Sequence, residues 1–149
     1  MKLFLAPQSN SSGNTHSALK TTVVIADDHP QMLEMVAGVL RPSFTILAQA
    51  EDGDIAFRAI TELRPQLAVL DLSMPRMHGI EVAKQLSATQ SLTKVVFLTL
   101  HAGEEFLSEA RRYGHGYVLK SRLHSDLIAA LYAALQGKFF ASNLAQPRP

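Results

Sequence analysis

Residues 23–28 read Val23-Val24-Ile25-Ala26-Asp27-Asp28, an uninterrupted apolar run that ends in two carboxylates. Continuous runs of this kind are typical of parallel strands that are buried on both faces of a sheet. Three further runs have the same form, namely Leu67-Ala68-Val69-Leu70 before Asp71, Val95-Val96-Phe97-Leu98 before Thr99, and Tyr117-Val118-Leu119 before Lys120. In an open α/β sheet, ligands bind beyond the carboxyl ends of the strands. The four runs therefore predict one edge where three carboxylates, a hydroxyl and an ammonium meet.

Helical patterns separate these runs. We expect a second strand over about 45–50 and helices over about 30–40, 54–63, 80–86, 104–113 and 125–136. Pro30 suits the first turn of a helix. Pro65 ends the second helix, because the residue before a proline avoids the helical conformation. Five alternating strand–helix units predict an α/β domain with a parallel sheet and helices on both faces.

Composition places the chain among ordinary globular proteins. It has 149 residues, 47% of them hydrophobic and 18% charged, which suits one domain with a proper core. It has no cysteine, which excludes disulfides and thiolate chemistry, and its formal net charge is +1, with no cluster of Lys and Arg typical of a nucleic-acid surface. No apolar run approaches the roughly 20 residues needed to cross a bilayer, so we expect a cytoplasmic protein without a membrane partner.

The chain divides into three segments. Residues 1–20 are predicted to be a flexible tail, because Ser, Asn, Thr and Gly dominate residues 8–20 and bury too little apolar surface to become ordered. Residues 21–138 contain all the strand and helix patterns and are predicted to form the folded domain. Residues 139–149 are expected to be a C-terminal tail or the start of a linker.

The polar residues at the strand ends indicate phosphoryl chemistry. Asp27, Asp28 and Asp71 would repel one another, and a hard divalent cation such as Mg²⁺ would offset that repulsion. An aspartate can act as a nucleophile and form an aspartyl phosphate. Lys120 would then attract one phosphoryl oxygen as a point charge, and the Thr99 hydroxyl would donate a hydrogen bond to another.

The sequence resembles a known family. Asp27-Asp28, the stretch Asp71-Leu72-Ser73-Met74-Pro75-Arg76-Met77-His78-Gly79, Thr99, and Gly116-Tyr117-Val118-Leu119-Lys120 are similar to the signature of response-regulator receiver domains. The resemblance covers about residues 22–137. It implies a flavodoxin-like (βα)5 three-layer sandwich with sheet order 2-1-3-4-5. It also implies a phosphoacceptor in two-component signalling, which catalyses only its own phosphorylation and dephosphorylation and is otherwise not an enzyme.

The resemblance assigns roles to individual residues. Asp71 would take a phosphoryl group from a sensor histidine kinase or a phosphotransfer protein, with Thr99 and Lys120 holding the phosphoryl oxygens. Asp28, Asp71 and the backbone carbonyl of Ser73 would bind Mg²⁺ directly, and Asp27 would act mainly through bound water. Thr99 and Tyr117 would form the switch, with Tyr117 turning inward as Thr99 moves toward the phosphate. Ser73 and His101, each two residues beyond a site residue, would tune the lifetime of the phosphoryl group.

Two features resemble a subfamily. His29 after the acidic pair, and the run Gly116-Tyr117-Val118-Leu119-Lys120, are similar to receivers that carry a LuxR-type helix-turn-helix output domain. That similarity implies control of transcription, with DNA bound only through an output domain absent from this chain. A homodimer on phosphorylation is a separate expectation, and the sequence does not choose between a surface on the first and last helices and one on the fourth helix, fifth strand and fifth helix. Many receivers place a proline with a cis peptide after the lysine, whereas this chain has Ser121.

Other readings stay open at this stage. The chain is either a receiver cut from a longer regulator, which we favour, or a stand-alone receiver that acts by protein contact or in a phosphorelay. A phosphatase that forms an aspartyl phosphate would need an acid where Ser73 stands and a cap segment that this chain lacks. His29, His78 and His101 lack the close spacing of a transition-metal site and are expected to be partly exposed loop residues.

Overall fold

The computed structural model describes residues 3–5, 19–100 and 103–142. These residues form a seven-stranded sheet in the order β1-β3-β2-β4-β5-β6-β7. The strands are β1 (Leu3–Leu5), β2 (Thr21–Ala26), β3 (Phe44–Ala50), β4 (Leu67–Asp71), β5 (Lys94–Thr99), β6 (Gly116–Leu119) and β7 (Phe140–Ala141). Every neighbouring pair is parallel except β1 and β3, which are antiparallel. The five central strands have the expected 2-1-3-4-5 order, so the flavodoxin-like fold is confirmed.

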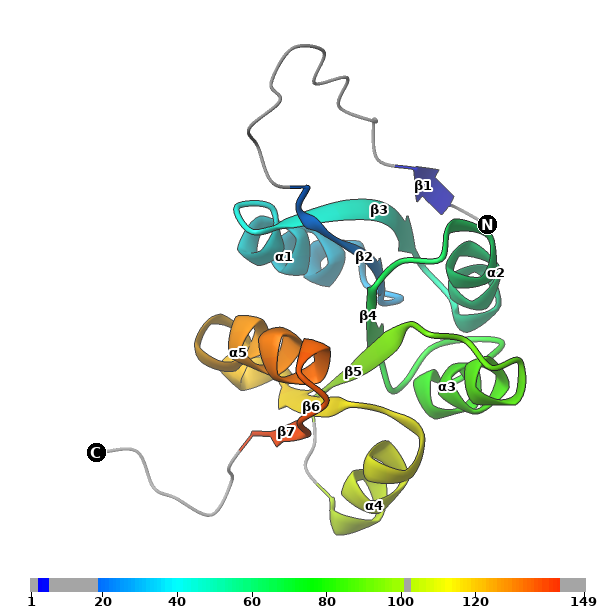
Figure 1. The fold of residues 1–149 in the computed structure, drawn as a ribbon, viewed down its shortest axis with the longest axis vertical. Helices are drawn as coiled ribbons and strands as arrows, with labels where there is room; N and C mark the ends of the chain where they lie inside the picture. The colour runs from blue at the N-terminus through cyan, green and yellow to red at the C-terminus, as the bar shows by residue number, and fades with distance from the viewer. Residues whose placement is uncertain (1–2, 6–18, 101–102, 143–149) are drawn as a thin grey trace.

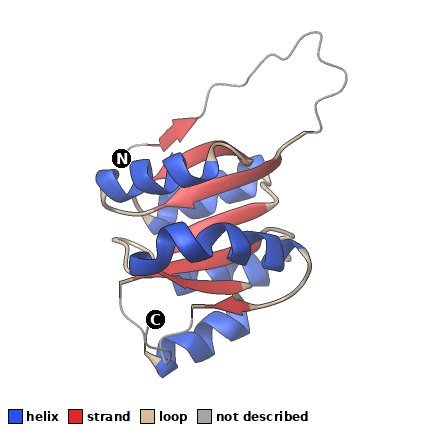
Figure 2. Cartoon of the chain, turned by 90° about the vertical axis from the view of Figure 1, so that its left-hand side faces the viewer, coloured by secondary structure: helices blue, strands red, loops and turns tan. Residues whose placement is uncertain are grey.

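Five α-helices cover the two faces of the sheet. They are α1 (Pro30–Leu40), α2 (Gly53–Leu63), α3 (Gly79–Ala88), α4 (Glu104–Tyr113) and α5 (Leu123–Leu135), and a 3-10 turn, η1 (Lys120–Arg122), precedes α5. Figure 1 shows α1 and α5 on one side of the sheet and α2, α3 and α4 on the other. Turned by 90°, the stacked strands lie between these helix layers (Figure 2). The molecule is therefore a three-layer sandwich.

Each face of the sheet has its own hydrophobic core. Successive residues of a strand point to opposite faces, and β2 shows this directly: Val24 packs with α2 and α3, whereas Val23 and Ile25 pack with α1 and α5. All three side chains are at most 1% exposed. Burial on both faces explains why the strands read as continuous apolar runs in the sequence.

The two edges of the sheet contain short strands that we did not expect from the sequence. Leu3–Leu5 falls in the segment that we expected to be a flexible tail, but it pairs with β3 as an antiparallel edge strand. Phe140–Ala141 falls in the expected C-terminal tail, but it pairs with β6 as a parallel strand. Short edge strands of this kind are held by backbone pairing with an open edge, which leaves little trace in the pattern of side chains.

Candidate phosphoacceptor site

The acidic residues meet where β2 and β4 end. These strands pair in parallel with Ala26 opposite Leu70, which brings Asp27 and Asp71 to the same edge of the sheet. Asp27 is 1% exposed and Asp71 is 3% exposed. The backbone N–H of Asp27 donates to the carbonyl of Ala50, 3.0 Å away at the end of β3. The sheet therefore holds two carboxylates where water is scarce.

Lys120, the residue directly after β6, supplies the opposite charge. Its ammonium lies 2.7 Å from Asp27 Oδ2 and 3.3 Å from Asp71 Oδ2, and its side chain is only 4% exposed. Burial alone would lower the pKa of Lys120, but the carboxylates of Asp27 and Asp71 outweigh burial and raise that pKa above its ordinary value. Lys120 opens the turn η1, and the peptide to Ser121 is trans. The lysine is thus a fixed cation facing both acids.

The Asp71 carboxyl has a raised pKa. Burial and the neighbouring charge of Asp27 raise its pKa from 3.8 to about 6, although Lys120 and a backbone hydrogen bond act in the opposite direction. That hydrogen bond comes from the Ser73 N–H, which donates to Asp71 Oδ1 over 3.4 Å. Because the ionised form of Asp71 is unfavourable in the protein without a metal ion, a bound cation would stabilise that form.

The residues present fit a divalent metal ion. One ligand atom from each of Asp27, Asp28, His29 and Asp71 lies within 4.8 Å of the others. Asp27 Oδ2 and Asp28 Oδ1 are buried oxygens whose polar neighbours are the Lys120 ammonium at 2.7 Å and His29 Nδ1 at 3.0 Å, respectively. Clustered carboxylate oxygens suit a hard cation, and Mg²⁺ is commonly bound through one or two carboxylates with several waters.

His29 is a member of this cluster that sequence reasoning did not place there. Its Nδ1 lies 3.2 Å from Asp27 Oδ1 and 3.0 Å from Asp28 Oδ1, and its side chain is 66% exposed. Its backbone N–H also donates to Asp27 Oδ1 over 2.9 Å. The sequence feature that indicates this place is the position of His29, directly after the acidic pair and directly before α1.

Thr99 and Ser73 lie beside the acids, at the wall of a cavity. Thr99 ends β5 and is 7% exposed. Both residues line a hollow of about 640 Å³ between α3 and α4, together with His78 and Phe106. His101 lies outside the described residues. The metal-binding role of the Ser73 carbonyl and the phosphoryl-binding role of Thr99 stay predictions.

Tyr117 faces inward from β6. It is 2% exposed and belongs to the core on the α2, α3 and α4 side of the sheet. Burial raises the pKa of its phenol, and a hydrogen bond from the backbone of Gly103 acts against that rise. This contact connects Tyr117 to the residue that precedes α4. Its proposed role as a switch stays a prediction.

The loop after β4 approaches Asp71 closely. The Leu72 N–H donates to the Leu98 carbonyl over 3.0 Å, and the Gly79 N–H donates to the Leu72 carbonyl over 3.1 Å. A Cβ at Gly79 would collide with the carbonyl oxygen of Asp71. Glycine at this position therefore lets the start of α3 lie against the end of β4.

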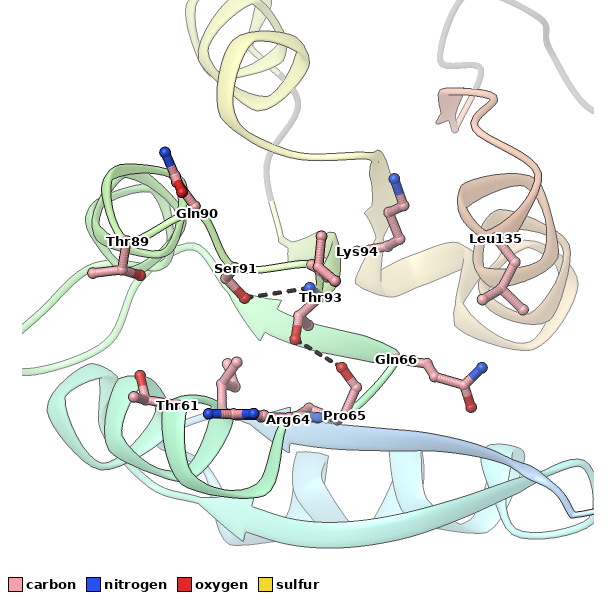
Figure 3. A pocket seen from close by; sticks show the side chains of 12 residues that line it. Thr61, Arg64, Pro65, Gln66, Thr89, Gln90, Ser91, Thr93, Lys94 and Leu135 are labelled. Atoms are coloured by element: carbon pink, nitrogen blue, oxygen red, sulfur yellow. Dashed lines mark hydrogen bonds between the residues drawn. The ribbon is translucent and has the colours of Figure 1, made fainter.

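A second cavity lies at the opposite end of the strands. It has a volume of about 660 Å³ and is lined by residues that precede or begin β4 and β5, including Arg64, Gln66 and Lys94. Figure 3 shows that the side chains of Arg64 and Lys94 do not point toward one another. Thr93 Oγ1 donates to the Pro65 carbonyl over 2.7 Å and ties the two loops together. This hollow brings together none of the predicted site residues.

Comparison with known proteins agrees with this geometry. The profile of the response regulator receiver domain matches residues 23–132. The chain is 35% identical over 122 residues to the uncharacterized transcriptional regulatory protein YxjL of Bacillus subtilis, which covers 80% of this chain and 56% of that protein. It is 31% identical over 129 residues to the nitrate/nitrite response regulator protein NarL of Escherichia coli, covering 85% of this chain and 60% of NarL. The chain therefore spans little more than half the length of these relatives.

Solved structures give the same match. The signal receiver domain of the putative response regulator NarL from Mycobacterium tuberculosis superposes with a TM-score of 0.77 at 29% identity, over 81% of this chain and 100% of that chain. The isolated receiver domain of RcsB from Salmonella enterica, in the presence of the phosphomimetic BeF3−, superposes with a TM-score of 0.75 at 28% identity, over 83% of this chain and 94% of that chain. Among the described residues, no helix has the length and apolar character required to span a membrane.

Proposed function

This chain belongs to the response regulator receiver domain family, and from that premise we propose that it is a Mg²⁺-dependent phosphoacceptor whose Asp71 takes a phosphoryl group from a histidine kinase or a phosphotransfer protein. The observation that carries the proposal is the position of Lys120, whose ammonium contacts both Asp27 and Asp71 at the edge where the acidic cluster lies. A buried cation and a buried cluster of acids at one strand edge fit phosphoryl transfer better than they fit a purely structural role.

The chemistry follows from the side chains. One oxygen of the Asp71 carboxylate attacks phosphorus, the bond from phosphorus to the donor histidine nitrogen breaks, and the nitrogen keeps the electron pair. Mg²⁺ held by Asp28, Asp71 and the Ser73 carbonyl, with Asp27 acting through water, would screen the charge of the incoming phosphoryl group. Lys120 and Thr99 hold the phosphoryl oxygens, and the raised pKa of Asp71 means that, without the metal ion, about half of the carboxyl is still protonated at pH 6.

The output of this switch is proposed to be control of transcription. A charge placed on Asp71 draws Thr99 toward it, and the inward Tyr117 transmits the change to α4 through its contact with Gly103. Relatives of this chain are named as transcriptional regulators, and one related solved structure contains RcsB dimers bound to DNA. For this chain we propose a homodimer on phosphorylation and DNA contact through a further domain, with the whole system acting in the cytoplasm.

Ser73 is proposed to influence the lifetime of the phosphoryl group, together with His101. The Ser73 N–H donates to Asp71, and the residue lines the cavity through which water would approach the phosphoryl group. A change in the dephosphorylation rate of Ser73→Ala or His101→Ala would support this role, and unchanged rates in both variants would exclude it.

The test of the proposed function is the intact mass of the protein after incubation with acetyl phosphate, with and without Mg²⁺. We expect a gain of one phosphoryl group that requires Mg²⁺ and disappears in Asp71→Ala. Asp54→Ala is the matched control, because Asp54 is a partly exposed acid that pairs with Arg58 and does not belong to the acidic cluster. A folded wild-type protein that gains no mass would overturn the proposal.

A further inference from the structure

The chain that leaves α5 is tied to the rest of the domain at Ser142. Its hydroxyl donates to Asp126 Oδ2 over 2.7 Å and accepts from the backbone N–H of Leu119 over 3.1 Å. Its own N–H donates to the carbonyl of Tyr117 over 2.9 Å. Ser142 is 7% exposed and Asp126 is 6% exposed. A single serine therefore bridges the first turn of α5 and the backbone of β6.

Asp126 orients the Ser142 hydroxyl. An ionised carboxylate can only accept hydrogen bonds, so the proton of the hydroxyl is directed to Asp126 and a lone pair is left for Leu119. Arg122 Nε donates to Asp126 Oδ2 over 2.8 Å, and Ser125 Oγ donates to Asp126 Oδ1 over 3.0 Å. Burial alone would raise the pKa of Asp126, but these donors and Ser142 outweigh burial and lower the pKa below its ordinary value.

Ser142 contacts the backbone of Tyr117, which belongs to the proposed switch, and the backbone of Leu119. Leu119 directly precedes Lys120, whose ammonium lies between Asp27 and Asp71. Tyr117 is the inward aromatic residue connected to Gly103. Figure 1 shows β7 alongside β6, at the end of the sheet near α4 and α5. The same segment also contacts α4, because the Arg111 guanidinium lies 4.6 Å from the centre of the Phe139 ring.

We propose that Ser142 and Asp126 form a latch that couples the chain leaving α5 to the phosphoacceptor edge. Ser142 is a positioning residue in this proposal: it fixes the backbone from which Lys120 extends, and it touches no reacting atom. The inference rests on the proposed function of Asp71. It adds the route by which a change at Lys120 and Tyr117 reaches residues 140–142, and hence whatever chain follows them.

Coupling of this kind must act in both directions. If phosphorylation of Asp71 moves β6, it changes how tightly Ser142 is held, and removal of the latch then changes the free energy of the phosphorylated state relative to the unphosphorylated one. A merely structural hydrogen bond would contribute to stability without either effect. The two directions are separately measurable.

The first measurement is amide hydrogen exchange at Leu119 and Ser142 by NMR, in the full 149-residue chain with Mg²⁺, before and after beryllium fluoride is added. We expect a change of about fivefold or more in the protection of both amides, the size of effect that one hydrogen bond produces. Unchanged protection of both amides, in a sample whose Asp71 amide signal shows that the anion is bound, would overturn the latch.

The second measurement is the rate of phosphorylation by acetyl phosphate and the rate of loss of the phosphoryl group. Ser142→Ala is expected to change one of these rates about threefold or more, and Ser142→Thr, which keeps the hydroxyl, should restore it. Ser125→Ala is the matched control, because the Ser125 hydroxyl bonds to Asp126 and to the Arg122 carbonyl but to no residue of β6 or β7. Asp126→Asn replaces Ser142→Ala if that variant fails to fold.

The outcomes separate the latch from the function on which it rests. Normal phosphorylation of the wild type with unchanged rates in Ser142→Ala would overturn the latch and leave the proposed function intact. Absence of any phosphoryl gain in the wild type would overturn the proposed function, and the coupling with it. Equal effects of Ser125→Ala and Ser142→Ala would show that the network stabilises α5 only, which also overturns the latch.

Discussion

The Lys120 ammonium lies 2.7 Å from Asp27 Oδ2, and this contact joins the residue that follows β6 to the residue that follows β2. Both side chains are nearly inaccessible to water, with exposures of 4% and 2%. Breaking a buried pair by removing one partner leaves an uncompensated charge, which is far more costly than losing an exposed pair. Lys120 is therefore expected to contribute to the stability of the fold in addition to its proposed chemical role.

The first prediction concerns the charge of Lys120. We expect Lys120→Met to lower the free energy of unfolding by about 3–5 kcal/mol at pH 8 without Mg²⁺, because Asp27 and Asp71 lose their buried counter-ion. Urea denaturation in EDTA measures the loss, and added Mg²⁺ should recover part of it. Lys84→Met is the control: Lys84 forms an exposed pair with Glu109 at 3.7 Å, so it should cost less than about 1 kcal/mol. Equal losses in the two variants would contradict the prediction.

The second prediction concerns the pKa of Asp71, which the fold raises from 3.8 to about 6. The folded state then binds more protons than the unfolded state between these values, so the contribution of Asp71 to stability falls as the pH rises through this window. Asp71→Asn should therefore stabilise the Mg²⁺-free protein above pH 7 by about 2 kcal/mol, with almost no effect near pH 4. Urea denaturation across this pH range in EDTA tests the sign. Stabilisation of the same size at pH 4 would argue against titration of Asp71.

The third prediction concerns His115, whose contribution to stability changes with pH in the direction opposite to that of Asp71. Burial, and then the charge of Lys94, lower the pKa of His115 below its ordinary value of 6.5. Its Nδ1 accepts a hydrogen bond from the Val95 N–H over 3.0 Å, which requires that nitrogen to be unprotonated. Stability should fall as the pH drops below about 6.5, because the unfolded state takes up the proton first.

The His115 effect is best measured in the Asp71→Asn background, where the opposing titration of Asp71 is absent. His115→Gln should remove the part of the pH dependence that lies near and below pH 6.5. A His115 pKa at or above 6.5 in an NMR titration of the folded protein would contradict this account.

The fourth prediction concerns the close approach of α3 to β4. Gly79→Ala should lower the free energy of unfolding by about 1–3 kcal/mol and slow phosphorylation, because the new Cβ collides with the Asp71 carbonyl. Gly38→Ala is the control on α1: a Cβ there meets no atom within 4 Å, so alanine should stabilise the helix by up to about 1 kcal/mol. Thermal unfolding and the acetyl phosphate assay give the two readouts. A Gly79→Ala protein as stable and as reactive as the wild type would refute the steric argument.

Much of the fold was predictable from local patterns. The helices over 30–40 and 104–113 have the expected bounds, whereas α3 and α5 begin one or two residues earlier than expected. The alternating strand and helix patterns predicted a parallel sheet with helices on both faces, and the resemblance to receiver domains implied the order of the five central strands. The edge strands β1 and β7 were not predicted, because three-residue and two-residue strands depend on an unpaired sheet edge rather than on their own side chains.

The sequence by itself determined which chemical groups lie at one edge of the sheet, because each of Asp27, Asp71, Thr99 and Lys120 directly follows or ends a buried strand and parallel strands bring such residues together. Only the tertiary structure decided how these groups interact. The contact of His29 with the acids, the raised pKa of Asp71 and the Ser142–Asp126 pair all depend on distance and burial across elements. Periodicity reports which face a residue occupies, whereas electrostatics and hydrogen bonding depend on separations of a few ångströms that only packing sets.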